Sequence, residues 1–120
     1  MSNQLPSQRI ASLEGVVRMS SVVIAELRRG ALRRSESNLI ESLEKNHRIL
    51  TPTEANWLES GRILAKMHLD HGFTPEKLRD LHFDVLIALT ARSHGAILIT
   101  SDRSDFELIH GYRSFRLEIW

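Results

Sequence analysis

The stretch LHFDVLIALTARSHGAILITSD, residues 81–102, indicates the fold class of this chain. Apolar residues recur at helical spacing over 81–94, and Gly95 is a typical residue for ending a helix. The run 96–100 that follows is continuously apolar and has the length of a strand buried on both faces of a parallel sheet. A long apolar helix that leads into such a strand predicts an α/β domain.

The rest of the chain continues the alternation of strands and helices. Further strands are expected at 16–20, 48–50 and 115–119. Helices are expected at 22–34, 38–45, 52–70 and 103–109, with a separate helical segment that begins near Pro75. The pattern predicts a three-layer α/β domain with a central parallel sheet over residues 16–120, preceded by an irregular polar segment over 1–15.

Short polar residues mark the expected helix starts. Ser21 is expected to cap the first helix, and Asp80 the helix over 81–94. Thr51 and Glu54 have the spacing of a capping box, with Pro52 at the first helical position.

The composition excludes several classes of protein. The chain has 120 residues, the size of one small domain, and no apolar run approaches the ~18 residues of a membrane helix. The start of the chain has no secretion signal, so we expect a cytoplasmic protein without membrane contact. The absence of cysteine excludes disulfides, thiol catalysis and thiolate zinc sites. The net charge of +1 does not favour any particular class of binding partner. Thirteen of the sixteen cationic side chains are Arg, however, and Arg is well suited to binding phosphate.

Four acidic residues from three separate segments are expected at one edge of the sheet. Glu26 follows the strand at 16–20, Asp84 lies on the helix before the strand at 96–100, and Asp102 and Asp105 follow that strand. Ligand sites of parallel α/β domains collect where strands end and helices begin. A cluster of carboxylates is costly unless it is protonated or neutralised, and hard oxygen ligands suit Mg²⁺ or Mn²⁺.

Each acid also has a purely structural interpretation. Glu26 could pair with Arg29 three residues on, which would contribute about 0.2–0.5 kcal/mol. Asp102 and Asp105 have the spacing of a helix cap and its third-position acid. Asp84 is the acid least suited to such a role, because its neighbours 83–89 are otherwise apolar and an ionised side chain there needs a partner.

Three segments resemble the acidic motifs of PIN-domain nucleases, in order and in spacing. They are SSVVIAEL at 20–27 followed by Gly30, DVLIALTA at 84–91 followed by Gly95, and ILITSD at 97–102 followed by Asp105 and Phe106. The resemblance covers about residues 16–119 and is nearest to the VapC-like toxins of toxin–antitoxin pairs. It implies a Mg²⁺-dependent endoribonuclease in which Glu26, Asp84 and Asp102 bind the metal and Asp105 assists. It also implies an RNA substrate, a homodimer and a cognate antitoxin.

The sequence departs from this family at its start. PIN domains begin with a strand that ends in a metal-binding Asp, whereas no Asp occurs here before Asp70 and residues 1–14 contain no apolar strand. In the family that strand is central, between the strands matching 16–20 and 96–100. We therefore expect an N-terminally truncated PIN-like domain with weakened Mg²⁺ affinity and impaired catalysis.

Arginines near the acidic residues are candidates for RNA binding. Arg29 and Arg33 fall three and seven residues after Glu26 on the expected helix, and Arg103 follows Asp102. A solvated basic helix face is the alternative. At the level of the whole protein, a non-catalytic PIN-like protein that binds an antitoxin or RNA, or that dimerises, is the alternative to the nuclease. An unrelated nucleotide-binding α/β protein is disfavoured because no glycine-rich strand-to-helix turn is present.

Overall fold

The structure is a computed structural model that describes residues 17–120, so the expected irregular segment over 1–15 lies outside the described residues. Strands and helices alternate along this part of the chain, which is an α/β domain. The elements are β1 (Arg18–Ser20), α2 (Ser21–Gly30), α3 (Arg34–Asn46), β2 (Arg48–Leu50), α4 (Glu54–His71), α5 (Pro75–Ser93), β3 (Ile97–Thr100), α6 (Arg103–Tyr112) and β4 (Arg116–Ile119). No helix within residues 17–120 is long and apolar enough to span a membrane.

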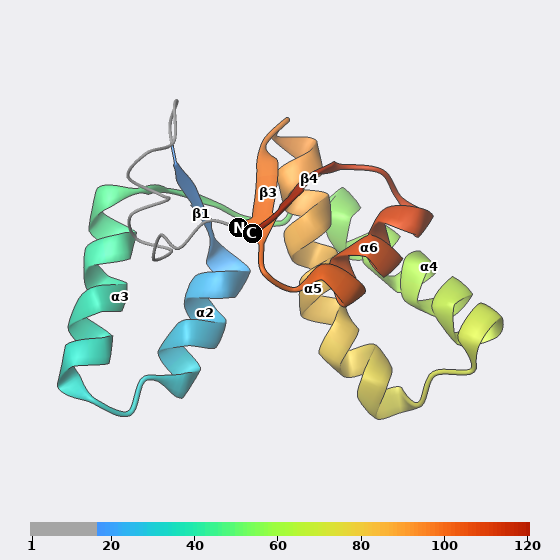
Figure 1. Cartoon of the computed structure of the whole chain (residues 1–120), viewed down its shortest axis with the longest axis horizontal. Coiled ribbons are helices and arrows are strands. Elements are labelled where there is room, and N and C mark those ends of the chain that lie inside the picture. The colour runs from blue at the N-terminus through green and yellow to red at the C-terminus, as the bar shows by residue number, and fades with distance from the viewer. Residues whose placement is uncertain (1–16) are drawn as a thin grey trace.

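The described strands form two parallel pairs. β1 pairs with β2, with Arg18 opposite Arg48, and β3 pairs with β4, with Ile97 opposite Arg116. Within residues 17–120 no ladder joins β1 to β3. The two pairs divide the described chain into an N-terminal half, residues 18–50, and a C-terminal half, residues 54–119 (Figure 1).

The hydrophobic core lies in the C-terminal half, around α5. The second part of this helix is almost entirely buried, and α4 and α6 both pack against it (Figure 1). Burial of each large aliphatic side chain contributes about 1.5–3 kcal/mol, which makes this helix the principal source of stability. The buried core cluster consists of Ile63, Met67, Leu81, Val85, Ile87, Ala88, Leu89, Phe106, Ile109 and Phe115.

The N-terminal half buries much less apolar surface. Its buried hydrophobic side chains within the described range are Ile24, Ile40 and Leu50. Val22 and Val23, at the start of α2, are partly buried against the main core. The first turn of α2 therefore connects the two halves, while α3 lies at the outer end of the molecule (Figure 1).

The turn between α5 and β3 confirms the role expected for Gly95. This residue has a left-handed backbone with φ of 62°, a conformation that glycine adopts without steric cost. Its N–H bonds to the carbonyl of Arg92, and the N–H of Ala96 bonds to the carbonyl of Ala91. This Schellman motif ends the helix and starts the strand two residues later.

The expected break between a segment at Pro75 and a helix over 81–94 is wrong. One continuous helix, α5, runs through both, and its cap is Thr74, whose hydroxyl accepts from the N–H of Lys77. Asp80 lies within this helix and does not cap it. Pro75 at the first helical position and the absence of a breaker after it explain why the helix continues.

Two other caps are shifted from their expected positions. The hydroxyl of Ser20, rather than of Ser21, accepts from the N–H of Val22 and starts α2. The box before α4 is formed by Thr53 and Asn56 instead of Thr51 and Glu54, because the Asn56 side chain reaches back to the N–H of Thr53. An amide side chain fills the role expected for a carboxylate in this box.

Candidate metal centre

The carboxylate of Asp102 is positioned by the start of α6. Asp102 is the N-cap of this helix, and its Oδ1 accepts a hydrogen bond from the backbone N–H of Asp105 at 3.3 Å. The N–H of Asp102 in turn donates to the hydroxyl of Thr100, the last residue of β3, at 3.1 Å. The expected cap by Asp102 is therefore confirmed and holds Asp102 and Asp105 at the end of β3, whereas Asp105 completes no capping box, because the N–H of Asp102 donates to Thr100.

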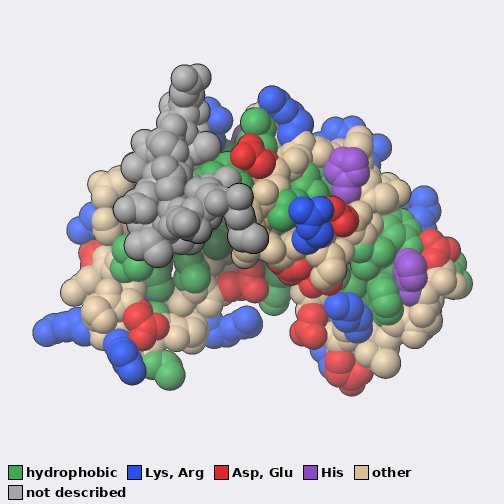
Figure 2. Space-filling model, viewed as in Figure 1, with side chains coloured by type: hydrophobic (Ala, Val, Ile, Leu, Met, Phe, Trp, Pro, Cys, Tyr) green, Lys and Arg blue, Asp and Glu red, His purple; other side chains and the backbone are tan. Residues whose placement is uncertain are grey.

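Three aspartates from two helices converge at this point. Asp84 on α5 faces Asp102 and Asp105, and one carboxylate oxygen from each residue lies within 4.8 Å of the others. Asp84 and Asp105 are half-buried, whereas Asp102 is exposed. Figure 2 shows acidic side chains in the middle of the face, where the N-terminal half meets the C-terminal half.

Glu26 lies outside this group of three but close enough to affect it. It is half-buried on α2, the helix of the N-terminal half that contacts α5. Its negative charge is one of the causes that raise the pKa of Asp84. The structure thus brings together Asp84, Asp102 and Asp105, with Glu26 near them on the other half.

The pKa of the Asp84 carboxyl is raised from 3.8 to about 7. Burial is the largest cause, followed by the negative charges of Asp105, Glu26 and Asp102, while Lys77 acts in the opposite direction. Repulsion of this kind arises where carboxylates share a site that lacks enough positive charge. The donor set fits a divalent cation, because three carboxylate oxygens at this spacing supply the hard ligands that Mg²⁺ and Mn²⁺ prefer.

Comparison with known proteins agrees with this geometry. The family model of the PIN domain matches residues 6–111. The chain belongs to the PIN-domain family. PIN domains generally use divalent metal ions, which is consistent with the acidic cluster. No curated protein sequence matches the chain.

Two solved structures share the fold of this PIN domain over most of their length. VapBC-1 from nontypeable Haemophilus influenzae has a TM-score of 0.67 and 25% identity, over 95% of this chain and 83% of that chain. VapBC2 from Rickettsia felis, bound to a DNA fragment from its promoter, has a TM-score of 0.68 and 19% identity, over 95% of this chain and 82% of that chain. Both comparisons support the α/β architecture described above.

Two of the arginines expected to bind RNA, Arg29 and Arg103, lie beside the segments that carry Asp84 and Asp102. The Arg29 guanidinium lies 6.0 Å from the ring centre of Phe83, the residue before Asp84. Arg103 is the first residue of α6 and pairs with Glu107 at 2.9 Å on the exposed side of that helix.

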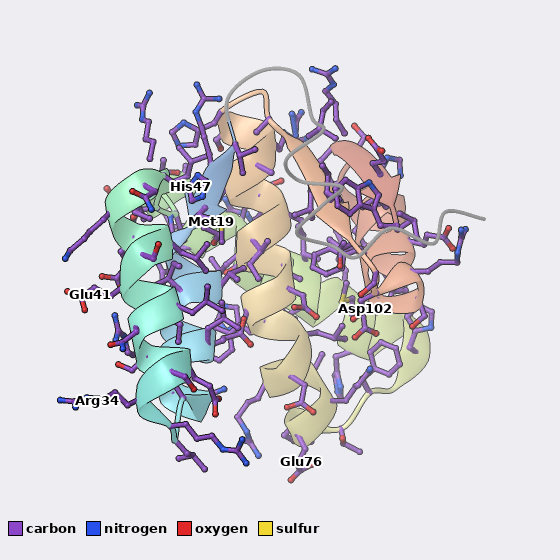
Figure 3. All side chains as sticks on the ribbon, turned by 60° about the vertical axis from the view of Figure 1, so that its left-hand side comes forward. Met19, Arg34, Glu41, His47, Glu76 and Asp102 are labelled. Atoms are coloured by element: carbon purple, nitrogen blue, oxygen red, sulfur yellow. The ribbon has the colours of Figure 1, made fainter. Side chains whose placement is uncertain are left out.

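Arg33 does not share a helix face with Glu26, because α2 ends at Gly30 and Arg33 occupies the N-cap position of the next helix, α3, without a side-chain capping bond. Its side chain is 84% exposed and lies 3.9 Å from Glu36. The next residue, Arg34, lies at the start of α3, on the opposite side of the view from Asp102 (Figure 3).

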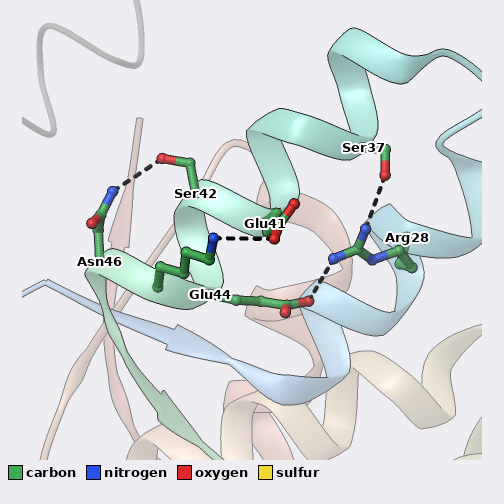
Figure 4. Close-up of polar contacts among 7 residues, drawn as sticks. Arg28, Ser37, Glu41, Ser42, Glu44 and Asn46 are labelled. Carbon is green, nitrogen blue, oxygen red and sulfur yellow. Dashed lines mark hydrogen bonds and ion pairs between the residues drawn. The ribbon is translucent and has the colours of Figure 1, made fainter.

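Arg28 has a structural role in the N-terminal half. Its guanidinium donates to the hydroxyl of Ser37 at 3.0 Å and to the carboxylate of Glu44 at 2.9 Å (Figure 4). These two contacts join α2 to α3. Arg28 is therefore engaged in contacts between these two helices.

Sequence reasoning missed one charged residue of the site, Lys77. Its Nζ lies 3.4 Å from Oδ1 of Asp105. Lys77 precedes Asp84 by seven residues, which places both on one face of a continuous helix. The expected break in α5 concealed this relation, and the sequence spacing would have shown it had the helix been extended back to Pro75.

Proposed function

We propose that this PIN domain is a divalent-metal-dependent endoribonuclease of the VapC toxin type. The observation that carries the proposal is the convergence of Asp84, Asp102 and Asp105 on one point at the end of β3. The similarity to two VapBC structures supports the toxin type.

In this proposal Asp84, Asp102 and Asp105 hold Mg²⁺ or Mn²⁺, and Glu26 contributes from α2. When bound, the cation supplies charge neutralisation and an activated water for hydrolysis of a phosphodiester. Asp84 accepts the ion only in its ionised form, so its pKa of about 7 makes proton release part of metal binding. No protein side chain acts as a nucleophile.

The RNA substrate is contacted by arginines beside the acidic residues. Arg29 and Arg103 adjoin the segments of Asp84 and Asp102, so they are assigned to phosphates near the cleaved bond. Arg33, which is exposed beyond the end of α2, is assigned to a phosphate farther along the strand. Phosphate contacts of this type give an affinity that falls with salt.

The proposed biological setting follows the VapBC neighbours. The chain acts in the cytoplasm as a homodimer, and a cognate antitoxin inhibits it. A protein that has lost catalysis but still binds an antitoxin or RNA is the alternative, and the activity test separates the two.

The test is cleavage of a fluorescent single-stranded RNA by the purified chain with Mn²⁺ and with a chelator. Replacing Asp84 by Asn removes an ion ligand, so activity falls on the order of 100-fold or more. Asp80→Asn is the matched control, because Asp80 is exposed on the same helix, and it retains activity. The cleavage activity of Glu26→Gln is expected to fall as that of Asp84→Asn does if Glu26 on α2 supplies a metal ligand. Equal background cleavage in all variants and in chelator would refute the nuclease and support the binding protein.

A further inference from the structure

Lys77 is the basic side chain placed at the cluster of three aspartates. Its position is fixed by the start of α5, where its N–H donates to the hydroxyl of Thr74 at 3.2 Å. From there the side chain reaches α6, and its Nζ lies 3.4 Å from Oδ1 of Asp105. The two side chains are 41% and 29% exposed, so water screens this pair less than a fully exposed one.

The charge of Lys77 acts on more than one of the aspartates. It opposes the raised pKa of Asp84 as well as pairing with Asp105. Among the ion pairs of residues 17–120, that of Lys77 and Asp105 is the one that involves any of the three aspartates. Arg79 and Arg103, the neighbouring basic residues, pair with Glu76 and Glu107 instead.

We propose that Lys77 is an internal counter-cation of this site, and that a divalent metal must displace it from Asp105 to bind. The inference rests on the proposed function, because it assigns the three aspartates to a metal. A cation coordinated by Asp105 at the ~2.1 Å typical of Mg²⁺ would lie within a few ångströms of the Lys77 ammonium. Two positive charges at that separation repel, so the ion pair and the metal are alternatives.

This competition gives Lys77 a defined effect on the loading of the site. Without metal, the ammonium offsets part of the repulsion among the carboxylates. At low metal concentration the paired state is favoured, and above a threshold concentration the metal replaces it. Lys77 is thus a positioning residue that sets the metal concentration at which the site fills.

The experiment measures Mn²⁺ affinity by electron paramagnetic resonance of the free ion at pH 8. Lys77→Met removes the competing charge, and we expect its dissociation constant to fall about fivefold relative to the unchanged protein. Lys77→Arg keeps the charge and is expected to bind Mn²⁺ as the unchanged protein does. Arg79→Met is the matched control, because Arg79 is an exposed basic residue on the same helix that pairs with Glu76, and its affinity is expected to stay constant.

A second readout guards against a variant that folds poorly. A ligand stabilises the folded state in proportion to the logarithm of its concentration over its dissociation constant, so Mn²⁺ raises the Tm of Lys77→Met more than that of the unchanged protein. An ion pair with a structural role alone would lower the Tm of Lys77→Met equally with and without Mn²⁺.

The outcomes separate this inference from the proposed function. If Mn²⁺ binding requires Asp84 but Lys77→Met binds no more tightly, the inference is wrong and the metal site stands. If only Lys77→Met binds Mn²⁺ measurably, the inference is supported. If neither protein binds Mn²⁺, both the inference and the metal site are rejected.

Discussion

The two halves of the molecule contribute differently to stability and to the site. The C-terminal half has a continuous core around α5 and supplies Asp84, Asp102 and Asp105. The N-terminal half has three buried hydrophobic side chains among its described residues and supplies Glu26. The difference shows that three of the four candidate ligands are held by one well-packed unit, whereas the fourth depends on how α2 packs against α5.

The strongest test of this comparison is truncation of one buried side chain in each half. Leu81 in α5 is fully buried within the core cluster, and Ile40 in α3 is 4% exposed. Leu81→Ala is expected to lower the free energy of unfolding by about 3–4 kcal/mol, and Ile40→Ala by about 2 kcal/mol, because the thinner half can collapse around the lost volume. Urea denaturation measures both. Equal losses would mean that the two halves are packed equally well.

A smaller effect on the free energy of unfolding is expected when the pH changes, because the acidic site that both halves share titrates. The pKa of Asp84 is raised in the folded state, from 3.8 to about 7. Between these two values the folded protein holds a proton that the unfolded chain has released, so stability falls as the pH rises from 4 to 7 and stays low above 7.

Asp84→Asn removes this titration without removing the side-chain volume. The variant should match the unchanged protein near pH 4 and be more stable by about 1 kcal/mol at pH 8, in the absence of metal. Thermal unfolding across this range is the measurement, with Asp80→Asn as control. A constant difference between the proteins at all pH values would contradict a raised pKa.

The smallest effect concerns the contact that joins α2 to α3. The Arg28–Glu44 pair is about two-fifths exposed on both sides, and such pairs contribute about 0.2–1 kcal/mol. A double-mutant cycle with Arg28→Ala and Glu44→Gln should therefore give a coupling energy near 0.5 kcal/mol by chemical denaturation. A value well above 1 kcal/mol would show that the N-terminal half is held more firmly by polar contacts than its sparse core indicates.

The parts of the fold that sequence predicted correctly depend on local interactions. Gly95 ends α5 through bonds to residues three to five positions away, and Asp102 caps α6 through Asp105. Such signals are contained in a few consecutive residues. The assignment to the α/β class likewise followed from short stretches, the apolar spacing over 81–94 and the apolar run 96–100.

The errors arose where neighbouring signals competed or where tertiary packing decided. Asp80 is a good capping residue, but Thr74 and Pro75 start the helix earlier and no breaker follows. Arg33 shares a face with Glu26 only in a helix longer than α2. The contact between Lys77 and Asp105 joins residues that are 28 positions apart on two different helices, and no local pattern contains it.

The helix cap formed by Asp102 affects the order in which the aspartates of this site would be replaced in evolution. Asp102 starts α6 whether or not an ion binds, so selection for folding alone would preserve it. Asp84 is the reverse case, since its burial among like charges destabilises the folded state and Lys77 opposes that effect only in part. In a descendant under selection for folding alone, Asp84 would be expected to be replaced first and Asp102 to remain.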